Sequence, residues 1–234
     1  MSLIQLRREV LAANLAIDRA GLVVLSFGNA SGVDRDAGVM VIKPSGVPYD
    51  ELGEDDLVVV RLADGAIVEG ERRPSSDTPT HLVLYRSFKG IGGIVHTHSI
   101  NAVGWAQARR AIPAFGTTHA DQFHGPVPVT RPLTADEIAG EYEANTGDVI
   151  IETFERAGLS PLELSGVLVA SHGPFTWGRD AAEAARHAIG LEAIAARAFQ
   201  TVLLRPDVSP VEDALLDRHF GRKHGPGAYY GQPR

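Results

Sequence analysis

The 234-residue sequence contains no cysteine, which excludes disulfides, thiolate metal sites and cysteine nucleophiles together and fits a reducing compartment. No stretch approaches the roughly 18 apolar residues that cross a membrane. The first 20 residues mix Arg7, Arg8 and Glu9 with leucines and lack the apolar run of a signal peptide. We therefore expect a cytoplasmic protein with no membrane partner.

Basic residues are also few, since 22 Lys and Arg against 29 Asp and Glu leave a net charge of −7. A general electrostatic grip on nucleic acid needs a basic face, so we expect no nucleic-acid partner. No Gly-x-Gly-x-x-Gly or Walker phosphate loop is present, and nothing indicates nucleotide binding. An anionic substrate must then be held by backbone amides, hydroxyls, or one or two local cations.

The composition, 44% hydrophobic and 22% charged without repeats or linkers, is typical of one globular domain over residues 1–234. A chain of this length can fold without a disulfide or metal staple, so a metal site would serve chemistry. Hydrophobic periodicity predicts a helix over residues 3–20. It predicts strands at 22–26, 39–42 and 94–97, with a last clear strand at 166–170. Segments 55–62 and 67–69 flank the hairpin signal Asp64-Gly65.

Further helices are expected later in the chain, three of them marked by signals at their starts. Thr78-Pro79 predicts an N-cap with proline at the first helical position, opening a helix to about residue 88. A helix is expected near residues 101–109, and Thr134 with Glu137 has the spacing of a capping box. Asp180 opens an Ala-rich helix to about residue 204. Meandering strands followed by helices predict an α/β sandwich with a central, partly antiparallel sheet.

The sharpest chemical signal is His96-Thr97-His98, directly after an apolar strand. Side chains at i and i+2 of a strand leave the same face, so the two imidazoles can converge on one ion. The alternative is a pair of hydrogen-bonded histidines at a strand end. His172, at the end of another apolar run, can complete a three-histidine set with an open position, the pattern of catalytic metal sites. Imidazole and carboxylate ligands without thiolate favour zinc or another divalent transition ion.

Three short segments have the composition of anion-binding loops, in which glycine admits backbone amides to a phosphate and serine adds a hydroxyl donor. They are Gly28-Asn29-Ala30-Ser31, Lys43-Pro44-Ser45-Gly46 and Pro74-Ser75-Ser76-Asp77. The same residue types are common in plain turns and caps. Asp77 has two readings, since it can cap the helix after it or turn into a metal cavity.

Two further segments carry candidate acid–base groups. Asp121 lies in a polar loop between apolar segments, where such groups are often found. The paired Tyr229 and Tyr230 near the C-terminus need an apolar surface, so we expect the tail, from about residue 222 to 234, to dock against another part of the protein.

Together these segments resemble, nearly from end to end, the L-ribulose-5-phosphate 4-epimerase branch of the class II aldolase family. The matching motifs occur in order, and the one departure is Phe27, where tryptophan is common. They are Phe27-Gly28-Asn29-Ala30-Ser31, residues 41–47, 73–81, 91–99, 116–121 and 171–175, and Arg222-Lys223-His224-Gly225 leading to Tyr229-Tyr230-Gly231-Gln232.

The resemblance implies a role for each motif. His96, His98 and His172 would bind one zinc ion per subunit, with manganese or cobalt as substitutes, and Asp77 would be the carboxylate at the metal. Asp121 and Tyr230 would be the acid–base pair. The residues that contact the substrate, mainly its phosphate, would be Gly28, Asn29, Lys43, Ser45, Gly46, Ser75 and Ser76.

The resemblance also implies a fold and an activity. The fold would be a three-layer α/β/α sandwich with a mixed, largely antiparallel sheet, assembled as a homotetramer with active sites between subunits. The substrate would be a phosphorylated ketopentose, epimerised at C4 by cleavage and re-formation of the C3–C4 bond. Three alternatives stay open: a sugar-phosphate aldolase of the L-fuculose-phosphate type, a metal-dependent hydrolase, and a non-catalytic sugar-phosphate sensor.

Overall fold

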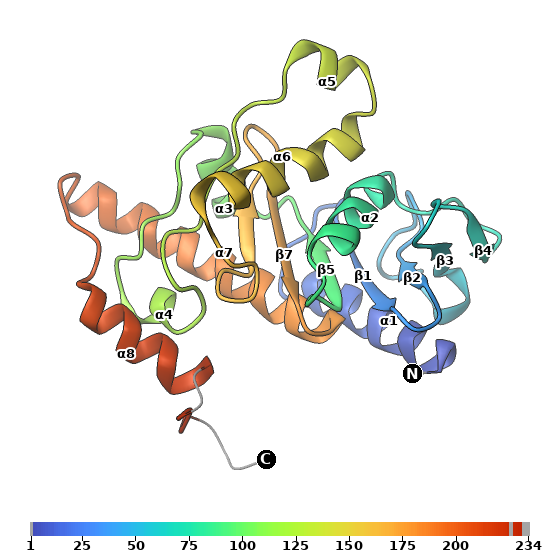
Figure 1. Cartoon of the computed structure of the whole chain (residues 1–234), viewed down its shortest axis with the longest axis horizontal. Coiled ribbons are helices and arrows are strands. Elements are labelled where there is room, and N and C mark those ends of the chain that lie inside the picture. Colours follow the sequence, from blue (N-terminus) through green and yellow to red (C-terminus); the bar gives the residue numbers. More distant parts are fainter. Residues whose placement is uncertain (1, 225–226, 231–234) are drawn as a thin grey trace.

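A seven-stranded sheet forms the centre of the molecule, in the order β4-β3-β2-β1-β5-β7-β6 (Figure 1). The structure is a computed structural model and describes residues 2–224 and 227–230. The strands are β1 (Asn29–Asp34), β2 (Val39–Ile42), β3 (Val58–Arg61), β4 (Ile67–Glu69), β5 (Gly93–His96), β6 (Gly166–Leu168) and β7 (Pro174–Gly178). All neighbouring strands pair antiparallel. The expected mixed character is therefore limited, within the described residues, to the single parallel bridge between Val129 and Leu168.

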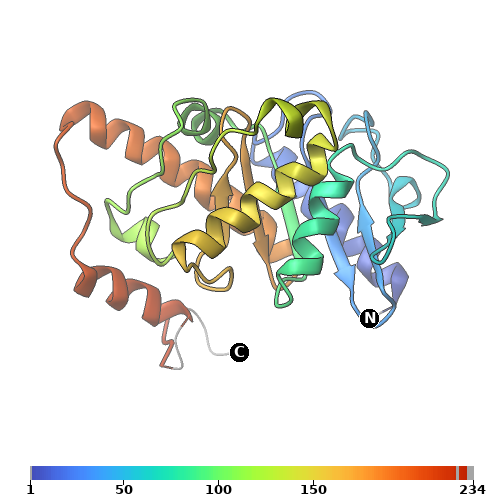
Figure 2. The same ribbon diagram turned by 45° about the horizontal axis from the view of Figure 1, so that its top comes forward.

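Helices cover both faces of this sheet, which confirms the expected α/β/α sandwich. In Figure 2, α2 (Thr78–Ser87) and α6 (Tyr142–Ala157) cross in front of the strands, and α1 (Leu3–Arg19) and α7 (Ala181–Leu204) lie behind them. The remaining elements are η1 (Glu54–Asp56), α3 (Ile100–Gln107), α4 (Thr117–Ala120), α5 (Ala135–Ala139) and α8 (Asp213–His224). None of the helices in the described part of the chain is long and apolar enough to span a membrane.

Alternating apolar residues of the strands build a core on each side of the sheet. Met40 and Ile42 of β2 pack in the core that contains residues of α2 and α6, whereas Val41 packs against α1 and the start of α7. Val59 and Val60 of β3 divide between the two cores in the same way. Because successive side chains leave opposite faces, a strand covered on both sides must be apolar throughout.

Most predicted elements are confirmed. The helices at α1, α2, α3 and α7, strand β2 and the β3–β4 hairpin lie where the sequence predicts them. The Thr134 hydroxyl accepts a hydrogen bond from the Glu137 amide at 3.3 Å, and the Asp180 carboxylate accepts from the Glu183 amide at 2.6 Å. The start of the predicted strand at 55–62 is instead the short 3₁₀ helix η1.

The predicted strand at 22–26 is wrong. The Leu22 amide donates a hydrogen bond to the Ile17 carbonyl, so Leu22 belongs to the turn that follows α1. Leu25 adopts a left-handed conformation with φ of 56°. The strand is instead β1, whose residues Asn, Gly and Asp are poor strand formers. β1 forms because it lies between β2 and β5 and because the buried Asn14 of α1 exchanges two hydrogen bonds with Ala30.

The predicted strand at 166–170 is present as β6, but it is not the last strand, because β7 follows and pairs with both β5 and β6. β7 begins with a proline and ends with a glycine, and both residues are uncommon in strands, so the sequence did not predict it. Its neighbour Gly93 permits a close approach: a Cβ there would lie 2.4 Å from the backbone of Asp180 and Ala181. Helix α7 can therefore start directly against the sheet. Helices α6 and α8 were not predicted either.

Candidate active site

Three histidines from two neighbouring parts of the sheet meet at one point. His96 ends β5, His98 follows it by two residues, and His172 lies in the turn between β6 and β7. β5 and β7 are paired with His96 opposite Phe175, which brings the turn that carries His172 to the end of β5. One ring nitrogen from each histidine lies within 4.8 Å of the others, so the group can hold a metal ion. The predicted three-histidine cluster is confirmed.

The chemistry of this cluster fits a divalent ion. The His96 Nδ1–H donates to the Pro174 carbonyl at 2.9 Å, which leaves Nε2 as the nitrogen that faces His98, 3.0 Å away. A hydrogen bond on the outer nitrogen is the usual way to orient a metal-binding imidazole. Burial lowers the pKa of His172 to about 3 and also lowers the pKa of His98. The uncharged rings keep the lone pairs that a metal ion needs.

Asp77 precedes α2, but its side chain does not cap that helix. Its Oδ2 accepts a hydrogen bond from the Asn29 amide at 2.7 Å. Burial acts to raise the pKa of Asp77, whereas its electrostatic interactions with His96 and His81 and the hydrogen bond from Asn29 lower it by more. The net effect is a lowered pKa, which keeps the group a carboxylate. Of the two readings of Asp77, the structure favours the one facing the cavity.

A cavity of about 360 Å³ joins the histidines to the three predicted anion-binding segments. Every residue predicted to bind metal or substrate lines it, although these residues come from segments far apart in the sequence. They are Gly28, Asn29, Lys43, Ser45, Gly46, Ser75, Ser76, Asp77, His96, His98 and His172. The cavity thus places a cation site beside a set of amide, hydroxyl and ammonium donors.

Among the described residues, Lys43 is the only lysine on this cavity wall, and it is buried, with 1% of its surface exposed. Its ammonium donates to the carbonyl of Val47 at 2.7 Å and, at 3.4 Å, to the carbonyls of Ser26 and Pro44. Burial lowers its pKa to about 8. Neutral acceptors surround the ammonium, so its charge remains available to an anion in the cavity.

Asn29 connects the metal side of the cavity to the anion-binding side. Its Nδ2 donates to Ser75 Oγ at 3.0 Å as well as to Asp77. Its Oδ1 is buried and has no partner among the described residues, so it can accept a hydrogen bond from a bound molecule.

Some lining residues were missed from the sequence, Ser26 among them. Tyr142 and Glu143 begin α6 and line the same cavity, and the Tyr142 ring centroid lies 6.3 Å from that of His172. No motif marks them, and α6 itself was not predicted. The contact between α2 and α6, in which the Thr80 hydroxyl donates to the Glu143 carbonyl at 2.6 Å, holds them at the site.

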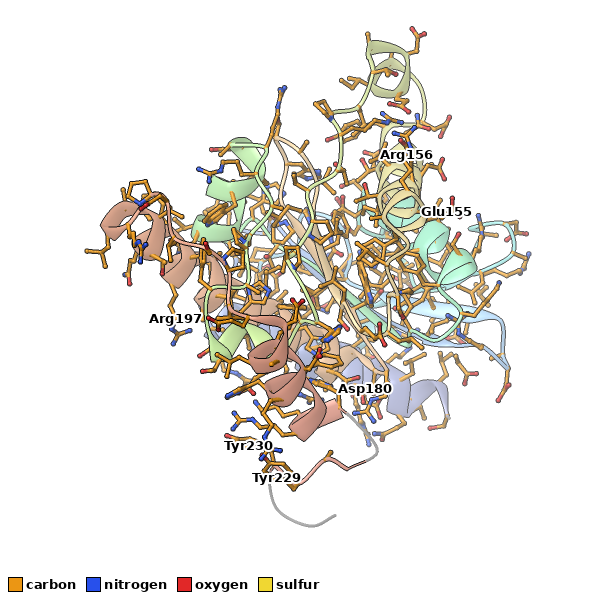
Figure 3. The ribbon with its side chains drawn as sticks, turned by 60° about the vertical axis from the view of Figure 1, so that its left-hand side comes forward. Glu155, Arg156, Asp180, Arg197, Tyr229 and Tyr230 are labelled. Atoms are coloured by element: carbon orange, nitrogen blue, oxygen red, sulfur yellow. The ribbon has the colours of Figure 1, made fainter. Side chains whose placement is uncertain are left out.

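The predicted acid–base pair does not line this cavity in the single chain. Asp121 lies at the end of α4 and contacts α8, and Tyr230, 61% exposed, lines a separate cavity of about 880 Å³ beside α8. Figure 3 shows Tyr229 and Tyr230 together beyond one end of α8. Gly225, Gly231 and Gln232 of the same motif lie outside the described residues.

The antiparallel α/β/α sandwich and the histidine cavity define the class of protein. Residues 8–199 match the family described as Class II Aldolase and Adducin N-terminal domain. The chain belongs to this class II aldolase family, as its motifs predict.

The chain is also similar to individual proteins of known name or structure. The chain is 51% identical over 228 residues to "L-ribulose-5-phosphate 4-epimerase UlaF" of Salmonella paratyphi A and of Salmonella typhi, covering 97% of this chain and 99% of each relative. Among solved structures it is similar to an L-fuculose 1-phosphate aldolase, with a TM-score of 0.78 and 25% identity over 94% of this chain and 96% of that one. It is also similar to YgbL from Klebsiella pneumoniae, with a TM-score of 0.73 and 26% identity over 93% and 99% of the two chains.

Proposed function

We propose that the protein is an L-ribulose-5-phosphate 4-epimerase, which interconverts L-ribulose 5-phosphate and D-xylulose 5-phosphate in the cytoplasm. The observation that carries this proposal is the single cavity in which the three-histidine group faces the anion-binding segments. The relatives that are 51% identical over nearly the whole chain bear the name of this enzyme. One small cavity with a cation site at one side and anion donors at the other suits a short phosphorylated sugar.

The reaction requires a carbon–carbon bond to break. Carbon 4 of the substrate carries no acidic hydrogen, so deprotonation cannot invert it. Cleavage of the C3–C4 bond gives the enediolate of dihydroxyacetone and glycolaldehyde phosphate. Rotation of the aldehyde presents its other face, and re-addition gives the epimer.

The anion-binding segments would retain the aldehyde fragment during this rotation. Gly28 and Gly46 have positive φ values of 87° and 71°, a conformation that L side chains rarely adopt. Ser45, Ser75 and Ser76 line the cavity beside these turns and offer hydroxyl donors. With Lys43 they would hold the phosphate, so that only the carbonyl group turns.

His96, His98 and His172, with Asp77, would hold one zinc ion per subunit, for which manganese or cobalt can substitute. When bound, the ion supplies Lewis-acid stabilisation to the oxygens of the enediolate, worth several kcal/mol. The chain itself supplies neutral imidazoles and one carboxylate, a donor set that suits zinc. Asn29 would hold the Asp77 carboxylate in place through its 2.7 Å hydrogen bond.

Asp121 and Tyr230 would exchange protons with the substrate oxygens, one on each side of the aldehyde. Since neither lines the histidine cavity of its own chain, a neighbouring subunit would supply them. This proposal requires a homotetramer with active sites between subunits, in which residues 1–234 form one unit and the tail from about residue 222 docks at a neighbour's site.

The second candidate is a sugar-phosphate aldolase, which releases both fragments. The similarity to an L-fuculose 1-phosphate aldolase structure supports this candidate. Both enzymes need the same cleavage and differ in whether the aldehyde escapes.

The test is to incubate metal-loaded protein with L-ribulose 5-phosphate and follow both D-xylulose 5-phosphate and free dihydroxyacetone. An epimerase should convert the substrate without releasing dihydroxyacetone, and an aldehyde-trapping reagent should barely slow it. Stoichiometric accumulation of free fragments would make the protein an aldolase. No turnover with metal-loaded protein would contradict both.

A further inference from the structure

Asp121 and Tyr230 lie 109 positions apart in the sequence, yet Arg222 of α8, like its neighbour Lys223, contacts both. Its Nε donates to Asp121 Oδ1 at 2.9 Å and its Nη2 to Oδ2 at 2.6 Å. The guanidinium also lies over the Tyr230 ring, 4.9 Å from its centroid. A bidentate pair of this kind sets direction as well as distance, which an ammonium cannot do.

The backbone of Arg222 makes a third connection. Its carbonyl accepts hydrogen bonds from the amides of Tyr229 at 3.0 Å and Tyr230 at 3.1 Å, which turns the tail back over the end of α8. The Lys223 ammonium also contacts both groups: it lies 3.4 Å from Asp121 Oδ2, farther than Arg222, and 4.4 Å from the Tyr230 ring centroid, nearer than Arg222. Arg222 therefore connects the tail to α8, the helix whose side chains contact Asp121.

We infer that Arg222 is a positioning residue that holds Asp121 and Tyr230 as one unit, which each chain delivers to a single active site. This inference rests on the proposed function, because it presumes that these two residues exchange protons with substrate. A shared clamp keeps the carboxylate and the phenol at a fixed separation, and small displacements of acid–base groups cost about 100-fold in rate.

The hydrogen bonds and ion pairs around Asp121 support the same role. His219 contacts Oδ1 at 3.0 Å, Lys223 and Arg222 contact the carboxylate from the next turn, and the His224 ring donates to the Asp121 carbonyl at 3.0 Å. Burial acts to raise the pKa of Asp121, and the bonds from Arg222 and His219 lower it by more. Loss of the guanidinium should raise this pKa. If the carboxylate is the active form, a variant without the guanidinium would then lose activity at a higher pH than wild type when the solution is acidified.

Arg218 offers a matched control, because it lies one turn earlier on α8 and is placed over the Tyr229 ring at 5.5 Å. We expect Arg222→Ala to lower kcat about 100-fold with KM changed less than about threefold and bound metal unchanged. The acid limb of its pH–rate profile should move to higher pH, and millimolar guanidinium chloride should restore part of the rate. Arg218→Ala should keep kcat within about twofold of wild type.

A second measurement is independent of catalysis. Without substrate, deuterium uptake at the amides of residues 227–230 should rise in Arg222→Ala and less in Arg218→Ala, because the guanidinium clamp on the tail is lost. If wild type fails to epimerise the substrate, the proposed function fails, and the uptake comparison still tests the clamp. Equal effects of the two substitutions would overturn the inference. So would a lower kcat in Arg222→Ala with an unmoved acid limb, no rescue and unchanged uptake.

Discussion

His96 and His98 reach the same point although the strand has ended between them. β5 ends at His96, yet the two Nε2 atoms lie 3.0 Å apart, as the one-residue spacing predicted. The place of His172 was inferred from a strand end as well, but the strand that brings it there, β7, was missed. The spacing of His96 and His98 therefore predicted that these two rings meet. The pairing of β5 with β7 places His172 beside them.

Replacing any one of His96, His98 and His172 with Ala should remove activity and weaken metal retention, since each offers one ligand nitrogen. Folding should survive, because the two cores do not depend on an ion. Metal content by plasma spectrometry and far-ultraviolet circular dichroism would check this. His124→Ala is a control, since its ring pairs with Asp217 at 2.8 Å, outside the cavity. Unchanged metal content in all three variants would show that the site assignment is wrong.

The charge of Lys43 predicts a pH dependence of substrate binding. Because burial lowers its pKa from 10.5 to about 8, the free protein loses this charge above pH 8. KM should be nearly constant below about pH 7 and rise through pH 8 and above, since a phosphate binds the charged form. Initial rates in Lys43→Met should show a higher KM without this rise. A wild-type KM that stays constant to pH 9.5, within the range of measurement, would argue against contact between Lys43 and the phosphate.

The same pKa shift has a consequence for stability. The unfolded chain holds the Lys43 proton up to about pH 10.5, whereas the folded chain releases it near pH 8. Between these values the unfolded state binds more protons, so the contribution of Lys43 to the free energy of unfolding rises with pH. Lys43→Met should reduce this slope in denaturant titrations.

Among the elements, the N-terminus of α3 is capped by a side chain of a distant helix, α7. Ser99 makes no side-chain cap, and the Glu192 carboxylate of α7 instead accepts from the amides of Asn101 at 2.8 Å and Ala102 at 3.0 Å. A carboxylate at this end satisfies free amides and interacts favourably with the helix dipole. Since α3 follows His98 by two residues, this contact also anchors the segment that carries the histidine.

Glu192→Ala should lower the free energy of unfolding by about 1–3 kcal/mol, because it leaves buried amides of α3 without partners. Urea denaturation followed by circular dichroism would measure the loss. The control is Glu155→Ala on α6, whose side chain is exposed (Figure 3) and whose replacement should cost less than about 0.5 kcal/mol. Equal stabilities of the two variants would show that Glu192 does not anchor α3.

For the whole molecule, the separation of Asp121 and Tyr230 from the histidine cavity leads to a test by mixing subunits. His96→Asn and Tyr230→Phe, each nearly inactive alone, should complement when unfolded and reassembled together. If a site takes His96 from one chain and Tyr230 from its neighbour, equal mixing restores about a quarter of the native sites. His96→Asn with Asp121→Asn should behave the same way.

A third mixture provides the contrast. Asp121→Asn with Tyr230→Phe should stay inactive, since no chain then carries both residues of the unit that Arg222 holds. Native mass spectrometry would establish that mixed assemblies form. If they form and the first mixture remains as inactive as its parents, Tyr230 acts within its own chain or not at all.

The sequence by itself determined the family, the sandwich and the predicted metal- and substrate-binding residues that line the cavity. These features depend on short-range patterns: apolar periodicity for α1, β2 and α7, and compact motifs around His96, Lys43 and Ser75.

Only the tertiary structure decided which of these groups share a cavity within one chain. β1 and β7 form through pairing with β5 against their own weak propensities, and α6 brings Tyr142 to the site through contacts with α2. The clamp from Arg222 to Asp121 likewise depends on packing of α8 against α4. Contacts between residues tens of positions apart leave no periodic trace in the sequence, because they depend on the whole fold rather than on neighbouring residues.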